Sequence, residues 1–472
     1  PPMLNRLPRA CLASLLVFCR RNASSAPAQP AAGQSGDAPT PTPTNVILLI
    51  PDGFGPASAT FARDYIRATS GRFELAFDSL HVGSTRTASS DSRITDSAAA
   101  GTALATGHKT YNGAISVDST GRPVAHLVEA AEARGMATGL VVTSRITHAT
   151  PAVFSAHVRD RGEENRIAVQ QLDAGLEILM GGGLRHFLPD ASGGERTDGR
   201  NLVGEATQAG YHVVQSASAL EQAPSEGTLL GLFADSHMAY EIDREQTQQP
   251  SLATMTQHAL DRLSGRENGF FLMVEGSRID HAGHSNDPAA HLHDILAFED
   301  AVAAALDYAR ADGETLVLVL SDHETGGLSV GRNRDGRGIY QWHPEPLAKV
   351  TASQGAMVRR IIAGNEPERV LAESAGIDSL RTEETERLRA AAGDAQALHA
   401  TLSEIIGRRS LVGWTSLAHT AVDVSTYAYG PGWEAFIGSH ENTYIAHALA
   451  QLLGADLDAL AHPTETTNTP SR

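Results

Sequence analysis

The sequence predicts an α/β fold, a three-layer sandwich with a central, mostly parallel sheet, plus a helical insert subdomain. Short apolar runs without alternation indicate strands buried on both faces, at residues 46–50, 138–142, 270–274 and 316–320. Helical patterns lie between these runs, at residues 123–134, 252–263 and 288–308. Strands that alternate with helices in this way are typical of one sheet with helices on both faces.

The last third of the chain interrupts this alternation and then resumes it. Residues 331–411 are rich in Arg, Glu and Ala and contain no strong strand pattern, so we expect an inserted helical subdomain there. A strand pattern returns at residues 424–429, and an amphipathic helix follows at about 442–453. The predicted boundaries are a core of residues 45–330 and 412–455, an insert of 331–411 and a polar tail of 456–472.

The first residues indicate a targeting segment. Two arginines precede an apolar run at residues 10–19, and small residues follow, which is typical of a secretory signal. The apolar run is too short to span a bilayer as a helix. We therefore expect residues 1–28 to be a signal, residues 29–44 to form a flexible lead-in, and the protein to be periplasmic or secreted.

Charge and cysteine content exclude several classes of partner. The 472-residue chain carries 55 acidic and 37 basic side chains, a net charge of -18 with neutral histidines. This charge repels a phosphate backbone or an anionic membrane, so we expect no nucleic-acid partner and no stable membrane insertion. Both cysteines, Cys11 and Cys19, lie in the predicted signal, so neither disulfides nor cysteine metal ligands are expected in the mature protein.

Acidic and imidazole side chains follow three of the predicted strands. Asp52 comes after the first strand, Glu275 ends the strand at 270–274, and Asp322 and His323 follow the strand at 316–320. Ligands of open α/β sheets bind at the carboxyl ends of the strands. We therefore expect these four groups to converge at one edge of the sheet.

Ser97 lies where an alanine-rich helix is predicted to begin, in the stretch Thr95-Asp96-Ser97-Ala98-Ala99-Ala100-Gly101. An Asp or Ser at such a position is most often only a helix cap. A helix N-terminus is also an anion site, because free backbone N–H groups and the positive end of the helix dipole lie there. A catalytic serine would need a base or a metal to activate it. This pattern alone does not decide whether Ser97 is only a helix cap or a nucleophile.

Three further positions have the side chains of metal ligands. Asp280 and His284 are four residues apart, so on a helix they share a face and could bind one ion. Asp322 and His323 are adjacent after a strand, and His419 precedes the strand at 424–429. Carboxylate and imidazole ligands without thiolate suit zinc, whereas magnesium is favoured where all ligands are oxygen.

Taken together, the motifs resemble those of the alkaline phosphatase family, in the same order along the chain and from about residue 45 to 453. They are Asp52, Asp96-Ser97-Ala98, residues 107–113, His148-Ala149-Thr150-Pro151, residues 275–284, Asp322-His323-Glu324 and His419. The resemblance implies hydrolysis of small-molecule phosphate monoesters through a phosphoserine at Ser97, with release of inorganic phosphate. It also implies a homodimer.

The resemblance further implies two zinc ions and one magnesium ion. One zinc would be held by Asp280, His284 and His419, the second by Asp52, Asp322 and His323, and the magnesium by Asp52, Thr150 and Glu275. Arg161 lies at the spacing of the arginine that grips the phosphate, and Arg159 is a neighbouring alternative. Two positions at which members of the family differ are both histidine here, His148 and His281, and we expect them near the substrate or behind the metal ligands. Because histidine leaves fewer carboxylates there, the magnesium site should be the weaker one.

Other functions share part of this pattern. A phosphodiesterase or a cofactor-independent mutase of the same superfamily would use the same metal core. A sulfatase would need a Cys or Ser in a characteristic motif for conversion to an aldehyde, and that motif is absent. From a different class, the chain could be a catalytically silent phosphate- or zinc-binding protein. Turnover of a generic aryl phosphate separates these alternatives.

Overall fold

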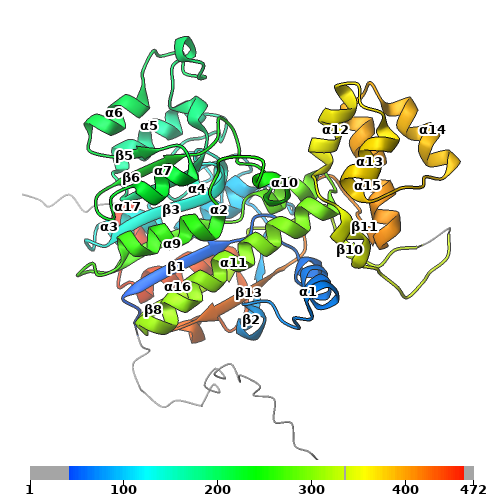
Figure 1. Cartoon of the computed structure of the whole chain (residues 1–472). Coiled ribbons are helices and arrows are strands. Elements are labelled where there is room, and N and C mark those ends of the chain that lie inside the picture. The colour runs from blue at the N-terminus through cyan, green and yellow to red at the C-terminus, as the bar shows by residue number, and fades with distance from the viewer. Residues whose placement is uncertain (1–41, 334–335, 462–472) are drawn as a thin grey trace, which may run out of the picture. The chain divides into compact units, whose positions relative to one another are not determined.

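A sheet of 10 strands forms the centre of the molecule (Figure 1). The computed structural model describes residues 42–333 and 336–461. The strands lie in the order β14 (Gly438–Glu441), β2 (His81–Arg86), β13 (Val424–Tyr429), β8 (Thr315–Leu320), β1 (Asn45–Ile50), β7 (Phe270–Glu275), β3 (Ala137–Arg145), β4 (Ile178–Gly182), β6 (Leu229–Leu232) and β5 (His212–Val214). Only β13 runs antiparallel to its neighbours β8 and β2, so the predicted mostly parallel sheet is confirmed.

Helices cover both faces of this sheet, because its strands are apolar on both sides. In β1, Ile47 and Leu49 enter one core, whereas Val46, Leu48 and Ile50 enter the other. The first core is covered by α1 (Pro56–Ser70), α7 (Ala217–Gln222), α8 (Glu241–Arg244), α9 (Leu252–Leu263), α10 (Arg278–His284) and α11 (Pro288–Asp312). The second is covered by α2 (Ser97–Thr106), α3 (Leu127–Glu132), α4 (Ala149–Ala152), α5 (Glu164–Ala174), α6 (Leu202–Gln208), α16 (Asn442–Leu452) and α17 (Leu457–Ala461).

The ends of two helices differ from the sequence prediction. Helix α3 begins at Leu127 and not near residue 123, because His126 caps it: Nδ1 of His126 accepts from the backbone N–H of Glu129. Helix α11 continues four residues beyond the predicted end at 308 and stops at Gly313, whose φ of 76° suits a residue without a side chain.

Residues 331–411 form the 3-10 turn η4 (Glu345–Lys349) and the helices α12 (Gln354–Ile362), α13 (Pro367–Ala375), α14 (Thr382–Ala391) and α15 (Ala395–Ser410). An antiparallel pair of short strands, β10 (Ser329–Val330) and β11 (Val412–Gly413), closes the segment at its base. Asp287 accepts a hydrogen bond of 2.6 Å from the backbone of Gln354, and Ser403 donates one of 2.8 Å to the carbonyl of Asn286. These contacts fasten the helices to the start of α11, while the division into core and insert stays a prediction.

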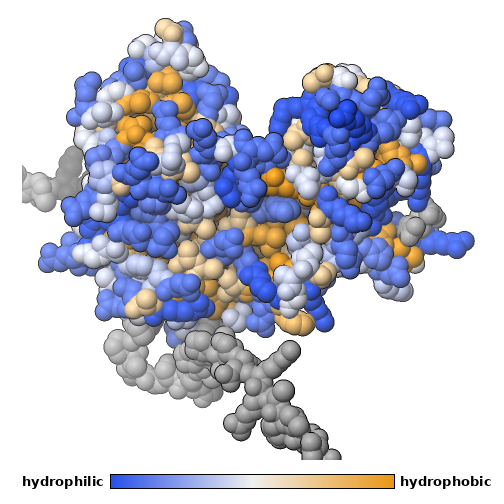
Figure 2. All heavy atoms as spheres, viewed as in Figure 1, coloured by the Kyte–Doolittle hydropathy of each residue, from blue (hydrophilic) through white to orange (hydrophobic). Residues whose placement is uncertain are grey.

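The predicted signal at 1–28, most of the lead-in at 29–44 and residues 462–472 of the tail lie outside the described residues. Within the described part of the chain, none of the helices is long and apolar enough to cross a membrane. The face drawn in Figure 2 is mainly hydrophilic, with separate small hydrophobic areas.

The remaining short elements are η1 (Asp78–Leu80), η2 (Leu184–His186), η3 (Asp190–Ser192), η5 (Trp433–Phe436) and the pair β9 (Glu324–Thr325) and β12 (His419–Thr420).

Candidate functional site

The predicted acidic groups meet at the carboxyl ends of β1, β7 and β8. Strand β1 pairs with β7 on one side and β8 on the other, so Asp52, Glu275 and Asp322 leave adjacent strands at the same edge. All three carboxylates are buried. Gly53 turns the chain after β1 with φ 73°, and a Cβ at this position would lie 2.8 Å from the Cα of Asp280. The turn therefore needs glycine to pack this closely.

Ser97 is the first residue of α2, and Asp96 caps the helix. Oδ1 of Asp96 accepts from the backbone of Ala99 at 2.9 Å, so the cap function belongs to Asp96 and the Ser97 hydroxyl is free for another partner. That partner is Nε2 of His323, 3.1 Å from the Ser97 oxygen. Nδ1 of His323 lies 3.3 Å from the Thr325 hydroxyl, whose own proton goes to Asp280. His323 therefore carries its proton on Nδ1, and Nε2 accepts from Ser97.

Asp280, His284 and His419 form a second group of converging ligand atoms. Nδ1 of His284 donates to the carbonyl of Leu417 at 2.7 Å, and Nδ1 of His419 donates to the carbonyl of Thr95 at 2.8 Å. Both Nε2 atoms thus present lone pairs, 3.1 Å apart and within 3.5 Å of Oδ1 of Asp280. Two lone pairs and a carboxylate facing one point repel each other unless a cation lies between them, and backbone partners on Nδ1 are typical of metal-bound histidine.

Buried carboxylate oxygens without partners give a second test of the fit to metal. Both oxygens of Asp52, Oε1 of Glu275 and Oδ2 of Asp322 are buried without a hydrogen-bond partner. Burial, together with the neighbouring carboxylates, raises the pKa of Asp52 well above its usual value. Burial likewise raises the pKa of Glu275 to about 8 and that of Asp322 to about 6. Such crowded carboxylates fit bound cations.

The structure groups the candidate ligands into three sets with ligand atoms within 4.8 Å of one another. These are Asp280, His284 and His419; Asp52, Asp322 and His323; and Asp52, His148 and Glu275. Thr150, predicted for the third site, lies on α4 and keeps a buried hydroxyl oxygen without a partner. His148, expected near the substrate or behind the ligands, has a ring nitrogen within 4.8 Å of the carboxylate oxygens of the third set. The first two sets contain the residues that the resemblance implies for the two zinc sites, and the third shares Asp52 and Glu275 with the site implied for magnesium.

Of the two candidate arginines, Arg161 faces the site. Its guanidinium donates to Oδ2 of Asp96 and to Nε2 of His148, each at 2.9 Å. Arg159 instead donates to the carbonyl of Gly121 at 3.1 Å. Arg161 is partly exposed and lies next to the residue that caps α2, so its remaining N–H groups and the helix N-terminus offer donors to one anion.

Sequence reasoning missed His237 and Thr325. The ring of His237 packs against that of His281 at a tilt of 57°, with ring centres 4.3 Å apart, and lies 5.4 Å from the ring of His148, so the predicted pair is a cluster of three. His237 follows strand β6 at the same edge of the sheet, and the strand-end rule could have found it. Thr325 lies inside the stretch after β8 and donates to Asp280 at 2.5 Å.

A three-layer α/β fold with carboxylates, imidazoles and a buried serine hydroxyl at its strand ends defines a metal-dependent hydrolase. Comparisons with known proteins agree with this class. A family model described as alkaline phosphatase matches residues 43–455. The repressible alkaline phosphatase of Saccharomyces cerevisiae is 39% identical over 463 residues, covering 88% of this chain and 82% of that protein.

Alkaline phosphatase 4 of Bacillus subtilis is 40% identical over 429 residues, covering 87% of this chain and 88% of that protein. The crystal structure of a cold-active alkaline phosphatase from a psychrophilic Shewanella species superimposes with a TM-score of 0.79 at 36% identity, covering 87% of this chain and 99% of that one. The chain therefore belongs to the alkaline phosphatase family, and it is a metal-binding hydrolase.

Proposed function

We propose that this enzyme hydrolyses phosphate monoesters in two steps through a phosphoserine at Ser97. The observation that supports it most is the place of the Ser97 hydroxyl, at the N-terminus of α2 and 3.1 Å from Nε2 of His323. A phosphoryl group on this oxygen would face the free N–H groups and the positive dipole end of the helix. The alternatives, a helix cap only or a silent binding protein, leave this hydroxyl without a role.

In the first step, the Ser97 oxygen forms a bond to phosphorus while the bond from phosphorus to the ester oxygen breaks, and the ester oxygen gains, in the net reaction, the proton that Ser97 loses, so that the alcohol leaves. In the second step, water attacks the phosphoserine, inorganic phosphate leaves, and the Ser97 hydroxyl is restored. Arg161 holds the phosphoryl oxygens throughout, and its contacts with Asp96 and His148 fix the direction of the guanidinium. Thr325 holds His323 in the tautomer whose Nε2 faces Ser97.

We propose two zinc ions and one magnesium ion as the cofactors, held by the residues that the family resemblance implies. Asp280, His284 and His419 suit one zinc, and Asp52, Asp322 and His323 suit the other, because each set combines imidazole and carboxylate. Asp52, Glu275 and the Thr150 hydroxyl give the oxygen-rich site that magnesium prefers, with His148 beside it. When bound, such ions supply positive charge that favours deprotonation of hydroxyl groups and balances charge on the phosphoryl oxygens.

Turnover of matched esters tests this function. The purified enzyme should hydrolyse 4-nitrophenyl phosphate, whereas bis(4-nitrophenyl) phosphate should react far more slowly. Chelation should abolish the activity, zinc should restore it, and added magnesium should raise it further. Faster hydrolysis of the diester would favour the phosphodiesterase alternative, and full activity without any zinc or similar transition metal would contradict the cofactor proposal.

We also propose a homodimer that is exported to the periplasm or the medium. The family resemblance supports the first proposal, and the signal pattern of residues 1–28 supports the second. Sedimentation at working concentration should give twice the monomer mass. Sequencing of the exported protein should place its N-terminus after the apolar run at residues 10–19.

A further inference from the structure

The candidate metal ligand His284 is the last residue of α10, and the helix ends there in a regular turn. The backbone N–H of Asn286 donates to the carbonyl of Gly283 over 2.9 Å. The backbone N–H of Asp287 donates to the carbonyl of Ala282 over the same distance. Asn286 has φ 46°, a left-handed conformation that asparagine adopts more readily than most residues. These features define a Schellman motif, which fixes where the backbone of His284 lies.

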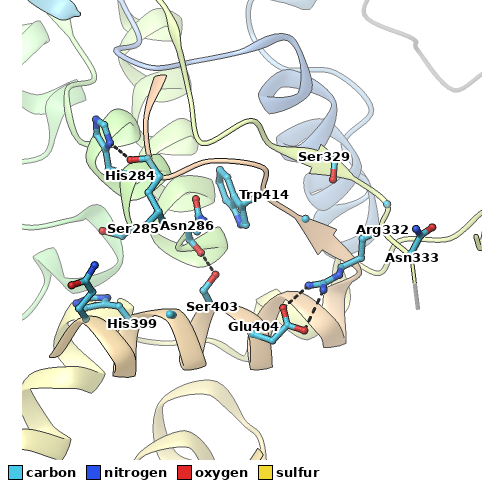
Figure 3. Close-up of a pocket in the computed structure, with 15 residues that line it drawn as sticks. His284, Ser285, Asn286, Ser329, Arg332, Asn333, His399, Ser403, Glu404 and Trp414 are labelled. Carbon is cyan, nitrogen blue, oxygen red and sulfur yellow. Dashed lines mark hydrogen bonds and ion pairs between the residues drawn. The ribbon is translucent and has the colours of Figure 1, made fainter. Parts of the chain in front are cut away.

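Two helices of residues 331–411 hold this turn. The hydroxyl of Ser403, on α15, donates to the carbonyl of Asn286 over 2.8 Å (Figure 3). Gln354 is the first residue of α12, and its backbone N–H donates to Oδ2 of Asp287 over 2.6 Å. Its side-chain amide donates to the carbonyl of Asn286 over 3.3 Å. Asp287 is buried and caps α11 with its other carboxylate oxygen, so the turn is fixed on both sides.

A cavity of about 1000 Å³ lies beside these contacts (Figure 3). Its lining includes His284, Asn286 and Ser403, together with the segment that carries Trp414. Close packing normally fixes the position of a buried helix end. Because the cavity interrupts that packing on one side of α10, the position of the helix end depends more strongly on the hydrogen bonds at the turn.

We propose that residues 331–411 keep the zinc ligand His284 in place, with Ser403 and Gln354 as positioning residues. This proposal rests on the zinc sites of the proposed function. Removing a group that orients a metal ligand typically lowers metal affinity by about ten- to a hundredfold. The carbonyl of Leu417 orients the ring of His284, and the turn at the end of α10 sets the backbone from which this ring projects. Loss of the bonds that hold the turn should therefore weaken this zinc site and leave the other zinc site unchanged.

Release of zinc from the metal-loaded enzyme to a chromogenic chelator tests the proposal. Comparison with His284→Ala identifies the zinc that belongs to this site. Ser403→Ala should release that zinc about three- to tenfold faster, because it removes one hydrogen bond. Gln354→Pro removes both donors of Gln354 and should release it about tenfold faster or more. Proline suits the first position of a helix, and Ser353 before it already has ψ 156°, so α12 should form in this variant.

Two further variants separate positioning from general stability. Ser403→Thr keeps the hydroxyl, and its extra methyl group has room in the cavity, so zinc should leave at the wild-type rate. Ser410→Ala is the matched control, because the Ser410 hydroxyl donates to carbonyls within α15 itself. In urea titrations, Ser403→Ala and Ser410→Ala should lose a similar unfolding free energy, but only Ser403→Ala should release zinc faster.

The outcomes also separate this proposal from the cofactor proposal. Wild-type release rates in Ser403→Ala and Gln354→Pro would overturn the role of residues 331–411, and so would an equal rise in the release rates of both zinc sites. The proposed hydrolase function would stand in either case. A wild-type enzyme that binds no zinc would instead refute the cofactor proposal itself.

Discussion

Arg161 donates a hydrogen bond to Nε2 of His148 over 2.9 Å. Arginine is only a donor, so Nε2 carries the lone pair and neutral His148 carries its proton on Nδ1. Burial, and after it the charge of Arg161, holds the pKa of His148 well below its usual value, so the ring stays neutral. His148 belongs to the set with Asp52 and Glu275, and its Nδ1 is buried without a hydrogen-bond partner. The imidazole beside the position proposed for magnesium therefore offers no free lone pair.

Replacing the imidazole of His148 by a carboxylate should strengthen magnesium binding. In His148→Asp, one oxygen can accept from Arg161 and the other can face the third site, so we expect magnesium to bind about tenfold more tightly. Metal analysis after dialysis and magnesium activation curves measure the change. His237→Asn is the control, because His237 lies in the same histidine cluster but not in the third set of ligands. An unchanged magnesium affinity in His148→Asp would contradict this account of the third site.

Substitution of Arg161 should weaken the binding of phosphate groups at the site. We expect Arg161→Ala to lower kcat/KM for monoesters by about a hundredfold and to raise the inhibition constant of inorganic phosphate. Arg161→Lys should recover only part of the activity, since one ammonium group cannot replace the planar guanidinium that bonds Asp96 and His148 together. Arg159→Ala is the matched control and should change kcat/KM little. Equal losses in the Arg159 and Arg161 variants would show that the assignment is wrong.

Local pattern was enough to predict the strand ends and the start of α2. Asp52, Glu275 and Asp322 follow apolar runs whose burial on both faces fixes them as central strands, so the chemistry at their ends was readable from the sequence. The start of α3 could not be predicted in this way. Histidine is an uncommon helix cap, and the helical pattern in the sequence begins upstream of His126, at residue 123.

Contacts between distant segments could not be predicted in the same way. The strand-end rule places His237 and His281 at the same edge of the sheet, but the contact between their rings depends on the packing of the loop after β6, which the sequence pattern does not specify. The cavity beside His284 likewise depends on how α15 packs against the start of α11, which the composition of residues 331–411 does not specify.

His126 should make the protein sensitive to acid. Burial lowers the pKa of this histidine to about 4, from an unfolded value near 6.5, so the unfolded chain binds the proton more readily. The stability that neutral His126 contributes is present above pH 6.5 and is lost as the pH falls toward 4. This loss is roughly 3 kcal/mol of unfolding free energy.

His126→Asn tests this prediction, because asparagine caps a helix without titrating. Its unfolding free energy should fall less than that of the wild-type protein between pH 6.5 and 4, as measured by urea titration at each pH. His440→Asn, at a partly buried histidine of β14 outside the α3 cap, should keep the wild-type slope. The same slope in His126→Asn as in the wild-type protein would rule out His126 as the source of the acid sensitivity.

The central claim is that Ser97 carries the phosphoryl group between the two steps. The most direct measurement is to mix the metal-loaded enzyme with radiolabelled inorganic phosphate, quench it in acid and map the label by peptide sequencing. The label should be found on the peptide that contains Ser97 and on no other. Ser97→Ala should take up no label, keep its metal and lose roughly a thousandfold or more in kcat. Label on a different residue, or wild-type activity in Ser97→Ala, would contradict the account.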